Sequence, residues 1–152
     1  MTIATRLAEL GIVLPTPPAP VASYVPFVRT GNFLVVSGQI PLEDGKVRYI
    51  GKLGADVDLA TGQAAARLCA INLLAQVQAA LGSLDQVARV VRLGGFVACT
   101  SDFSDHSKII NGASDLMFEV FGEIGRHARA SVGVPSLPMN AAVEIEGWFA
   151  IK

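Results

Sequence analysis

Three side chains near the carboxyl end are of the types that build polar sites: a cation at Arg129, a hydroxyl at Ser131 and a carboxylate at Glu144. Side chains of this kind are rare inside apolar strands unless they are paired or used. The pattern alone fits an ordinary Arg–Glu pair on a solvent face slightly better than a functional site. Both interpretations stay open at this point.

The elements that would position these side chains are two extended segments, predicted over residues 127–134 and 141–151 and joined by a turn with two prolines. Side chains alternate between the two faces of an extended chain. Arg129 therefore shares a face with Ser131, and Glu144 shares a face of the second segment with other side chains two residues apart. We expect the cation, the hydroxyl and the carboxylate to converge at a sheet edge or an interface.

Composition indicates one domain that spans residues 1–152, a length sufficient for a sizeable core. The 51% hydrophobic and 16% charged fractions, with a mean hydropathy of +0.48, also favour burial of some apolar surface between subunits. Lys and Arg total 12 against 13 Asp and Glu, and no cationic cluster occurs. Nucleic acid is therefore not an expected partner.

The sequence shows no recognisable cofactor or targeting motif. The two cysteines and two histidines lack the spacing of metal ligands, so no metal site is predicted. The start of the chain lacks the charged and apolar blocks of a signal peptide, and no uninterrupted apolar run approaches about 18 residues. We expect a cytoplasmic protein without a membrane partner.

The amino-terminal part predicts an extension and a hairpin. A short amphipathic helix is expected over residues 2–10, followed by an extended proline-rich connection over 14–20, so that residues 1–20 form an addition to the domain. Strands are predicted over 23–29 and 32–39 with a glycine turn between them.

The remaining elements alternate between strand and helix. A short strand is expected over 46–50, a long helix over 59–81, a strand over 88–99 with Gly94-Gly95 as a bulge or a point of close approach, and a helix from about 109 or 111 to 121. The order predicts an α+β fold with roughly six strands in a mixed sheet and two long helices.

Four stretches, taken in order, resemble the RidA family, also called the YjgF or endoribonuclease L-PSP family. The residues that carry the resemblance are Tyr24 and Ser37-Gly38-Gln39-Ile40-Pro41, Phe96-Val97, His127-Ala128-Arg129, and Leu137-Pro138 followed by Val143-Glu144-Ile145-Glu146. The resemblance covers nearly all of the chain after about residue 20. The amino-terminal extension and residues 110–113 are similar to a longer subgroup of that family.

The resemblance implies a chorismate-mutase-like fold, with a sheet backed by two helices, that assembles as a homotrimer with sites between neighbouring subunits. Its best-defined members are deaminases that hydrolyse reactive enamine or imine acids, such as 2-aminoacrylate, to 2-keto acids and ammonia. They need no metal or organic cofactor. The expected ligand of this chain is therefore a 2-imino or 2-keto acid.

The resemblance also implies roles for individual residues. Arg129 corresponds to the arginine that holds the substrate carboxylate, for which a guanidinium fork is well suited. Glu144 corresponds to the carboxylate associated with the attacking water. Five further positions correspond to the pocket lining: Tyr24, Ser37, Gly38, Ser101 and Ser131.

Two of these positions depart from the family pattern, because Ser131 stands where many members have Cys and Ser101 where many have Asn. Two other functions remain open beside deamination. One is a non-catalytic module that binds a small carboxylate in the same pocket. The other is ribonuclease or translation-inhibitor activity, which the near-neutral charge and the lack of a suitable His pair disfavour.

Overall fold

The computed structural model describes residues 1–20 and 22–152, and its centre is a five-stranded sheet with the order β1-β2-β7-β5-β6. The strands are β1 (Phe27–Thr30), β2 (Phe33–Gln39), β5 (Val87–Ala98), β6 (Ala128–Val134) and β7 (Val143–Ile151). Neighbours are antiparallel except β5 and β6, which are parallel. A two-stranded ribbon, β3 (Leu42–Glu43) and β4 (Lys46–Val47), follows β2.

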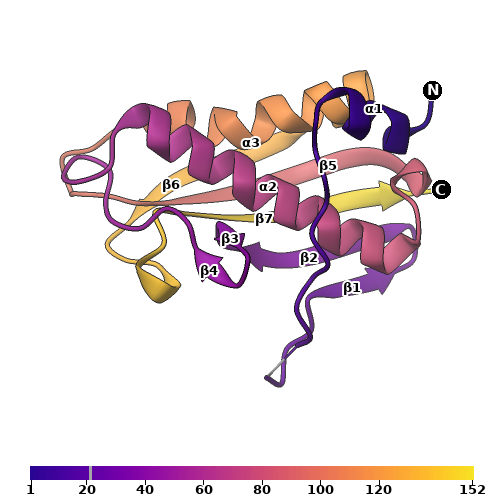
Figure 1. The fold of residues 1–152 in the computed structure, drawn as a ribbon, viewed down its shortest axis with the longest axis horizontal. Helices are drawn as coiled ribbons and strands as arrows, with labels where there is room; N and C mark the ends of the chain where they lie inside the picture. The colour runs from indigo at the N-terminus through magenta and orange to yellow at the C-terminus, as the bar shows by residue number, and fades with distance from the viewer. Residues whose placement is uncertain (21) are drawn as a thin grey trace.

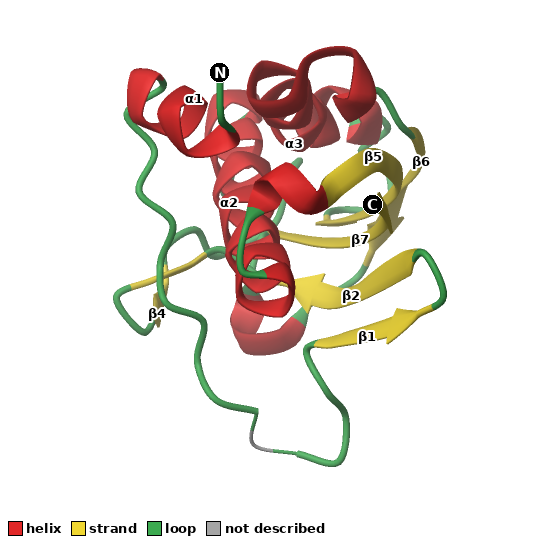
Figure 2. Ribbon diagram, turned by 90° about the vertical axis from the view of Figure 1, so that its right-hand side faces the viewer, coloured by secondary structure: helices red, strands yellow, loops and turns green. Residues whose placement is uncertain are grey.

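The long helices α2 (Leu59–Leu81) and α3 (His106–Phe121) lie side by side on one face of this sheet, as Figures 1 and 2 show. The other face carries no helix in the described part of the chain. The predicted mixed α+β architecture, with a sheet backed by two helices, is therefore confirmed.

The bounds of α2 match the prediction because both ends carry strong local signals. The Asp58 carboxylate accepts a hydrogen bond from the Thr61 amide at 2.8 Å and so caps the first turn. Gly82 ends the helix in the left-handed conformation, with φ of 76°, where a side chain would be strained.

Burial along β7 shows which side of the sheet is the core. Val143, Ile145, Gly147, Phe149 and Ile151 are buried, and the side chains between them are half-buried or exposed. The buried set faces α2 and α3, since a Cβ at Gly147 would meet Leu73 of α2. The alternate set, which includes Glu144, therefore faces the side without helices.

α2 and α3 approach each other closely at two glycines. A Cβ on Gly112 of α3 would overlap the main-chain carbonyl of Gln63 on α2. A Cβ on Gly62 would instead meet the terminal methyl of Ile109 at 2.7 Å. At Gly112 the two helices thus meet backbone against backbone. At Gly62 the backbone of α2 meets a flexible side chain instead.

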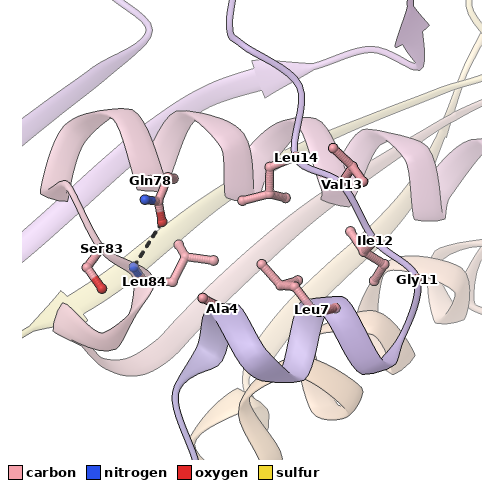
Figure 3. Close-up of a pocket in the computed structure, with 10 residues that line it drawn as sticks. Ala4, Leu7, Gly11, Ile12, Val13, Leu14, Gln78, Ser83 and Leu84 are labelled. Atoms are coloured by element: carbon pink, nitrogen blue, oxygen red, sulfur yellow. Dashed lines mark hydrogen bonds between the residues drawn. The ribbon is translucent and has the colours of Figure 1, made fainter.

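The amino-terminal helix α1 (Ile3–Glu9) agrees with the prediction and packs on α3 and on the turn that precedes β5. The Arg6 Nε donates to the Glu119 carbonyl at 2.7 Å, and the Ile3 amide donates to Asp85 at 2.9 Å. Between α1, the following chain and the end of α2 lies an apolar hollow of about 610 Å³, shown in Figure 3 with Leu7 and Leu84 in its wall.

Three predicted elements differ from the structure. The first strand begins at Phe27 rather than residue 23, because Pro26 has no amide hydrogen for the ladder. The strand expected over 46–50 is only Lys46–Val47, with Ile50 in an isolated bridge to Ala141. α3 begins at His106, three residues before the earliest expected start, because the Asp105 carbonyl accepts the first helical hydrogen bonds.

The predicted irregularity at Gly94-Gly95 is a close approach, and the bulges lie elsewhere. The register of β5 with β7 shifts between Val87 and Arg92, whereas both glycines pair regularly. A Cβ on Gly94 would meet Glu146, and a Cβ on Gly95 would meet Ile110 of α3. A side chain at position 94 would therefore clash on the face without helices, and one at position 95 on the helix-covered face.

By length and composition α2 could cross a membrane. In this fold its apolar surface packs against β2, β7 and α3, as that of a core helix does.

Candidate active site

Glu144 projects from β7 on the face of the sheet that no helix covers. It pairs with Phe96 of β5, and Phe96 pairs with Val132 of β6, so these three side chains share that face. Gly38 of β2 lies directly against the Glu144 carboxylate, because a Cβ at position 38 would overlap Oε1. The structure therefore brings together Gly38 and Glu144, two residues that the family resemblance assigns to one pocket.

The environment of Glu144 favours its protonated form more than water does. Partial burial raises the pKa of the Glu144 carboxyl, and the negative charge of Glu146 raises it further. Glu146 has its own counterion, since its Oε1 lies 3.5 Å from Nη1 of Arg92. Within residues 1–20 and 22–152, no ion pair includes Glu144. A carboxyl group of this kind is suited to proton transfer.

Two further predicted site residues are Ser37, which precedes Gly38 on β2, and Tyr24, which lies in the segment before β1. The Ser37 hydroxyl donates to the Val25 carbonyl at 2.8 Å, and its amide donates to the Pro26 carbonyl. These bonds fasten the segment before β1 to β2. Tyr24, which precedes the fastened residue, is 67% exposed and has its ring free to contact a second molecule.

Arg129 projects from β6 on the opposite face of the sheet. It pairs with Leu93, which in turn pairs with Gly147, and both of these residues face the helices. Its Nη1 donates to the Ser114 hydroxyl at 3.0 Å, and its Nη2 donates to the Ser107 carbonyl at 3.3 Å, both on α3. No carboxylate of the described chain pairs with it. Arg129 is thus a half-buried cation that has no counterion in the part of the chain that the structure describes.

Behind Arg129 lies His127, a residue that the sequence placed in a family motif without giving it a role. Its Nε2 is 2.9 Å from the Ser114 hydroxyl, and its Nδ1 is 2.6 Å from the Gly125 carbonyl. Burial lowers the pKa of His127, the Gly125 carbonyl opposes that effect, and the Arg129 charge lowers it again. Period-two spacing relates His127 to Arg129, but only the packing of α3 on β6 brings Ser114 between them.

Ser131, two residues after Arg129, is on the same face. Its Oγ is buried and has no hydrogen-bond partner among the residues that the structure describes. Further along the strand, Gly133 leaves room for His106 and Cys99, whose Nε2 and Sγ are 3.5 Å apart. The α3 side of β6 therefore carries a continuous polar strip.

Ser101, the remaining predicted site residue, lies in an exposed turn between β5 and α3. The nearby Thr100 hydroxyl donates to Asp102 at 2.6 Å and organises this turn. The turn is at the carboxyl end of β5, next to the end of β6 that carries Gly133.

The predicted site residues thus form two groups in one chain. Tyr24, Ser37, Gly38 and Glu144 belong to the first group, at β2, β7 and the segment before β1. The second group has Arg129 and Ser131 on β6, close to the turn that contains Ser101. Within one chain Arg129 and Glu144 do not converge, because their strand positions place them on opposite faces of the sheet. The simple surface pair between them is wrong for the same reason. Their convergence at an interface between chains stays a prediction.

Comparison with known proteins gives a consistent result. A family model described as "YjgF/chorismate mutase-like, putative endoribonuclease" matches residues 4–150. Protein TCP17 of Trypanosoma cruzi is 50% identical over 95% of this chain and 91% of its own length. A 2-iminobutanoate/2-iminopropanoate deaminase of Dermatophagoides farinae is 32% identical over 93% of this chain and 95% of its own.

Solved structures agree with the sequence relatives. A crystal structure of an Agrobacterium tumefaciens protein of unknown function superimposes with a TM-score of 0.93 and is 53% identical. The match covers 99% of this chain and 92% of the other. Both layers of the fold and the amino-terminal helix therefore fall within the matched region.

Proposed function

The chain belongs to the YjgF/chorismate mutase-like family, and on that basis we propose that it hydrolyses reactive 2-imino acids and their enamine tautomers to 2-keto acids and ammonia. 2-Aminoacrylate represents this substrate class. The relative named as a 2-iminobutanoate/2-iminopropanoate deaminase supports the reaction type. The observation that carries the proposal is the half-buried Arg129, whose guanidinium has no carboxylate partner in the described chain.

In this reaction Arg129 binds the substrate carboxylate. Two of its N–H groups are engaged by α3, and the remaining N–H groups are free to bind both carboxylate oxygens. The Ser131 hydroxyl, two residues further along the strand, is buried without a partner among residues 1–20 and 22–152 and would hydrogen-bond a polar atom of the substrate. Ser101, in the exposed turn, would contribute to the same part of the pocket.

Glu144 acts on water. Its carboxylate accepts a proton from a water molecule as the water oxygen bonds to the imine carbon, and it then gives that proton to the imine nitrogen, which becomes an amine. The resulting carbinolamine loses ammonia when its hydroxyl proton passes through Glu144 to the departing amine, which leaves the 2-keto acid and the free carboxylate. An enamine substrate first takes up a proton at its terminal carbon to become the imine. Gly38, Ser37 and Tyr24 would line this half of the pocket.

A complete pocket requires two copies of the chain. Arg129 and Glu144 lie on opposite faces of one sheet, so a neighbouring subunit must supply one of them. The face that carries Glu144 also exposes apolar side chains suited to an interface, namely Val28, Phe33, Val132 and Trp148. We therefore propose a homotrimer in which each cleft between subunits combines the two groups.

The deciding experiment generates 2-aminoacrylate in a coupled assay and follows the release of pyruvate. The wild-type protein is expected to accelerate pyruvate formation beyond spontaneous hydrolysis. Arg129→Ala should abolish the acceleration, and Arg129→Lys should retain a small part of it because an ammonium lacks the planar fork. Equal rates with and without wild-type protein would rule out the deaminase. A 2-keto acid that stabilises the wild type but not Arg129→Ala, without any turnover, would indicate a binding module instead.

Ribonuclease activity has less support in this chain. His106 and His127 lie at opposite ends of β6, and six residues of strand separate two points by about 20 Å. Within one chain the two imidazoles therefore cannot act on one phosphodiester as an acid–base pair. The net charge of −1 also gives a phosphate backbone little attraction.

A further inference from the structure

A chain of hydrogen bonds lies behind Arg129, and we propose that Ser114 and His127 are positioning residues that fix the direction of the Arg129 guanidinium. This inference rests on the proposed function, because it takes Arg129 as the group that binds the substrate carboxylate. Ser114 is on α3 and His127 precedes β6, so neither residue is placed against the reacting atoms. Their effect is transmitted through Arg129.

The donors and acceptors in this chain follow from elementary chemistry. The guanidinium can only donate, so the Ser114 oxygen accepts from Arg129 Nη1 at 3.0 Å. A carbonyl can only accept, so His127 Nδ1 carries a hydrogen and donates it to Gly125 at 2.6 Å. In a neutral imidazole Nε2 is then an acceptor, and it takes the remaining Ser114 hydroxyl hydrogen at 2.9 Å.

The surroundings support the neutral form of His127. Partial burial lowers its pKa, and the positive charge of Arg129 acts in the same direction. With that protonation state, every group has one role: Arg129 donates to Ser114, Ser114 donates to His127, and His127 donates to Gly125. Such a chain defines one position for the serine oxygen and hence one direction for Nη1.

The Gly125 end of this series of hydrogen bonds is held by the backbone. Gly125 is buried where a Cβ would overlap the carbonyl of Met117, so the backbone at this glycine is packed directly against α3. The second guanidinium nitrogen is fixed separately, by the Ser107 carbonyl at 3.3 Å. These two hydrogen bonds use two of the five N–H groups of Arg129 and leave three for a carboxylate.

The test measures both affinity and geometry. Titration of 2-oxobutanoate into the purified full-length protein, followed by calorimetry, gives Kd, and the imine assay gives kcat and KM. Ser114→Ala should weaken 2-oxobutanoate binding about tenfold and raise KM to the same extent with kcat nearly unchanged, because it removes a charged hydrogen bond that orients the anchor. Ser114→Thr keeps the hydroxyl and should restore the wild-type values. Ser104→Ala, an exposed serine just before α3, is the matched control.

Variants at position 127 distinguish an effect of the hydrogen-bond relay (Arg129 to Ser114 to His127 to Gly125) from an effect of lost packing. His127→Gln offers an amide oxygen as acceptor and should stay close to wild type, whereas His127→Ala should resemble Ser114→Ala. The double variant Ser114→Ala/His127→Ala should be no worse than Ser114→Ala alone, because the two residues act in series. Additive losses, or a wild-type Kd in Ser114→Ala, would overturn the proposal.

A further readout does not depend on any ligand or activity. Long-range 1H–15N NMR on the wild type should show the neutral His127 tautomer with hydrogen on Nδ1, and the Nε2 signal should move in Ser114→Ala. A tautomer with hydrogen on Nε2 would contradict the relay. If 2-oxobutanoate fails to bind the wild type while the NMR result holds, the assigned role of Arg129 fails and the relay stands.

Discussion

Arg129 and Glu144 leave opposite faces of the same sheet, although they lie only two strands apart. Arg129 is in register with Leu93 and Gly147 on the helix-covered face, and Glu144 is in register with Phe96 on the bare face. A single chain therefore cannot present both side chains to one small substrate. The proposed function therefore requires that one of the two groups come from a second copy of the chain.

The first prediction concerns complementation between inactive variants. Arg129→Ala and Glu144→Gln should each be inactive alone. When the two are co-expressed and purified as mixed oligomers, about a quarter of the clefts should combine an intact Arg129 with an intact Glu144 from a neighbour, and activity should return in proportion. Mixed oligomers that remain inactive would show that each site belongs to one chain. Separately purified variants mixed without subunit exchange are the control.

The second prediction tests the contact between Gly38 and the Glu144 carboxylate. Gly38→Ala should displace this carboxylate, destabilise the fold by about 1–3 kcal/mol through overpacking, and lower kcat. In a Glu144→Ala background the same substitution should cost little stability, because the group that it strikes is gone. Urea denaturation of the four proteins gives the coupling between the two positions. Equal costs in both backgrounds would disprove the contact.

The third prediction concerns pH. The base form of Glu144 is the deprotonated one, so activity should be lost as pH falls through the Glu144 pKa. Burial and the charge of Glu146 raise this pKa, which places the loss at a higher pH than for an ordinary glutamate. Glu146→Gln removes one cause and should move the acid limb of kcat/KM to lower pH. A limb that stays in place would exclude Glu144 as the titrating group.

The fourth prediction compares two glycines in the helix contact. Alanine favours a helix over glycine by about 1 kcal/mol, so steric cost decides the net effect of each substitution. Gly112→Ala would press a methyl group against the Gln63 carbonyl and should destabilise the protein by about 2 kcal/mol or more. Gly62→Ala meets only side-chain methyl groups, of Ile109 and Leu53, and should be close to neutral. Thermal unfolding of both variants measures this difference. Similar losses of stability in the two variants would contradict the prediction.

The elements that could be predicted are those with local determinants. Asp58 and Gly82 carry the signals for both ends of α2, and the alternation of buried and half-buried side chains in β7 was readable from its residues. α3 begins at His106, earlier than the residues predict, because nothing local distinguishes His106 from the loop before it. The strand predicted over 23–29 begins too early, because Pro26 has no amide hydrogen for the ladder and β1 starts at Phe27.

The sequence by itself determined the residue types of the site and the periodicity that puts Arg129 with Ser131. The order of the motifs was sufficient to indicate the family, because each motif consists of neighbouring residues and can be read without knowing how the chain packs. Strand period tells which residues share a face, yet it does not tell which face of one strand matches which face of another. Only the tertiary structure decided that Arg129 faces α3, where Ser114 and His127 hold it, and that Glu144 faces the bare side, since strand order and helix placement depend on contacts far apart in the chain.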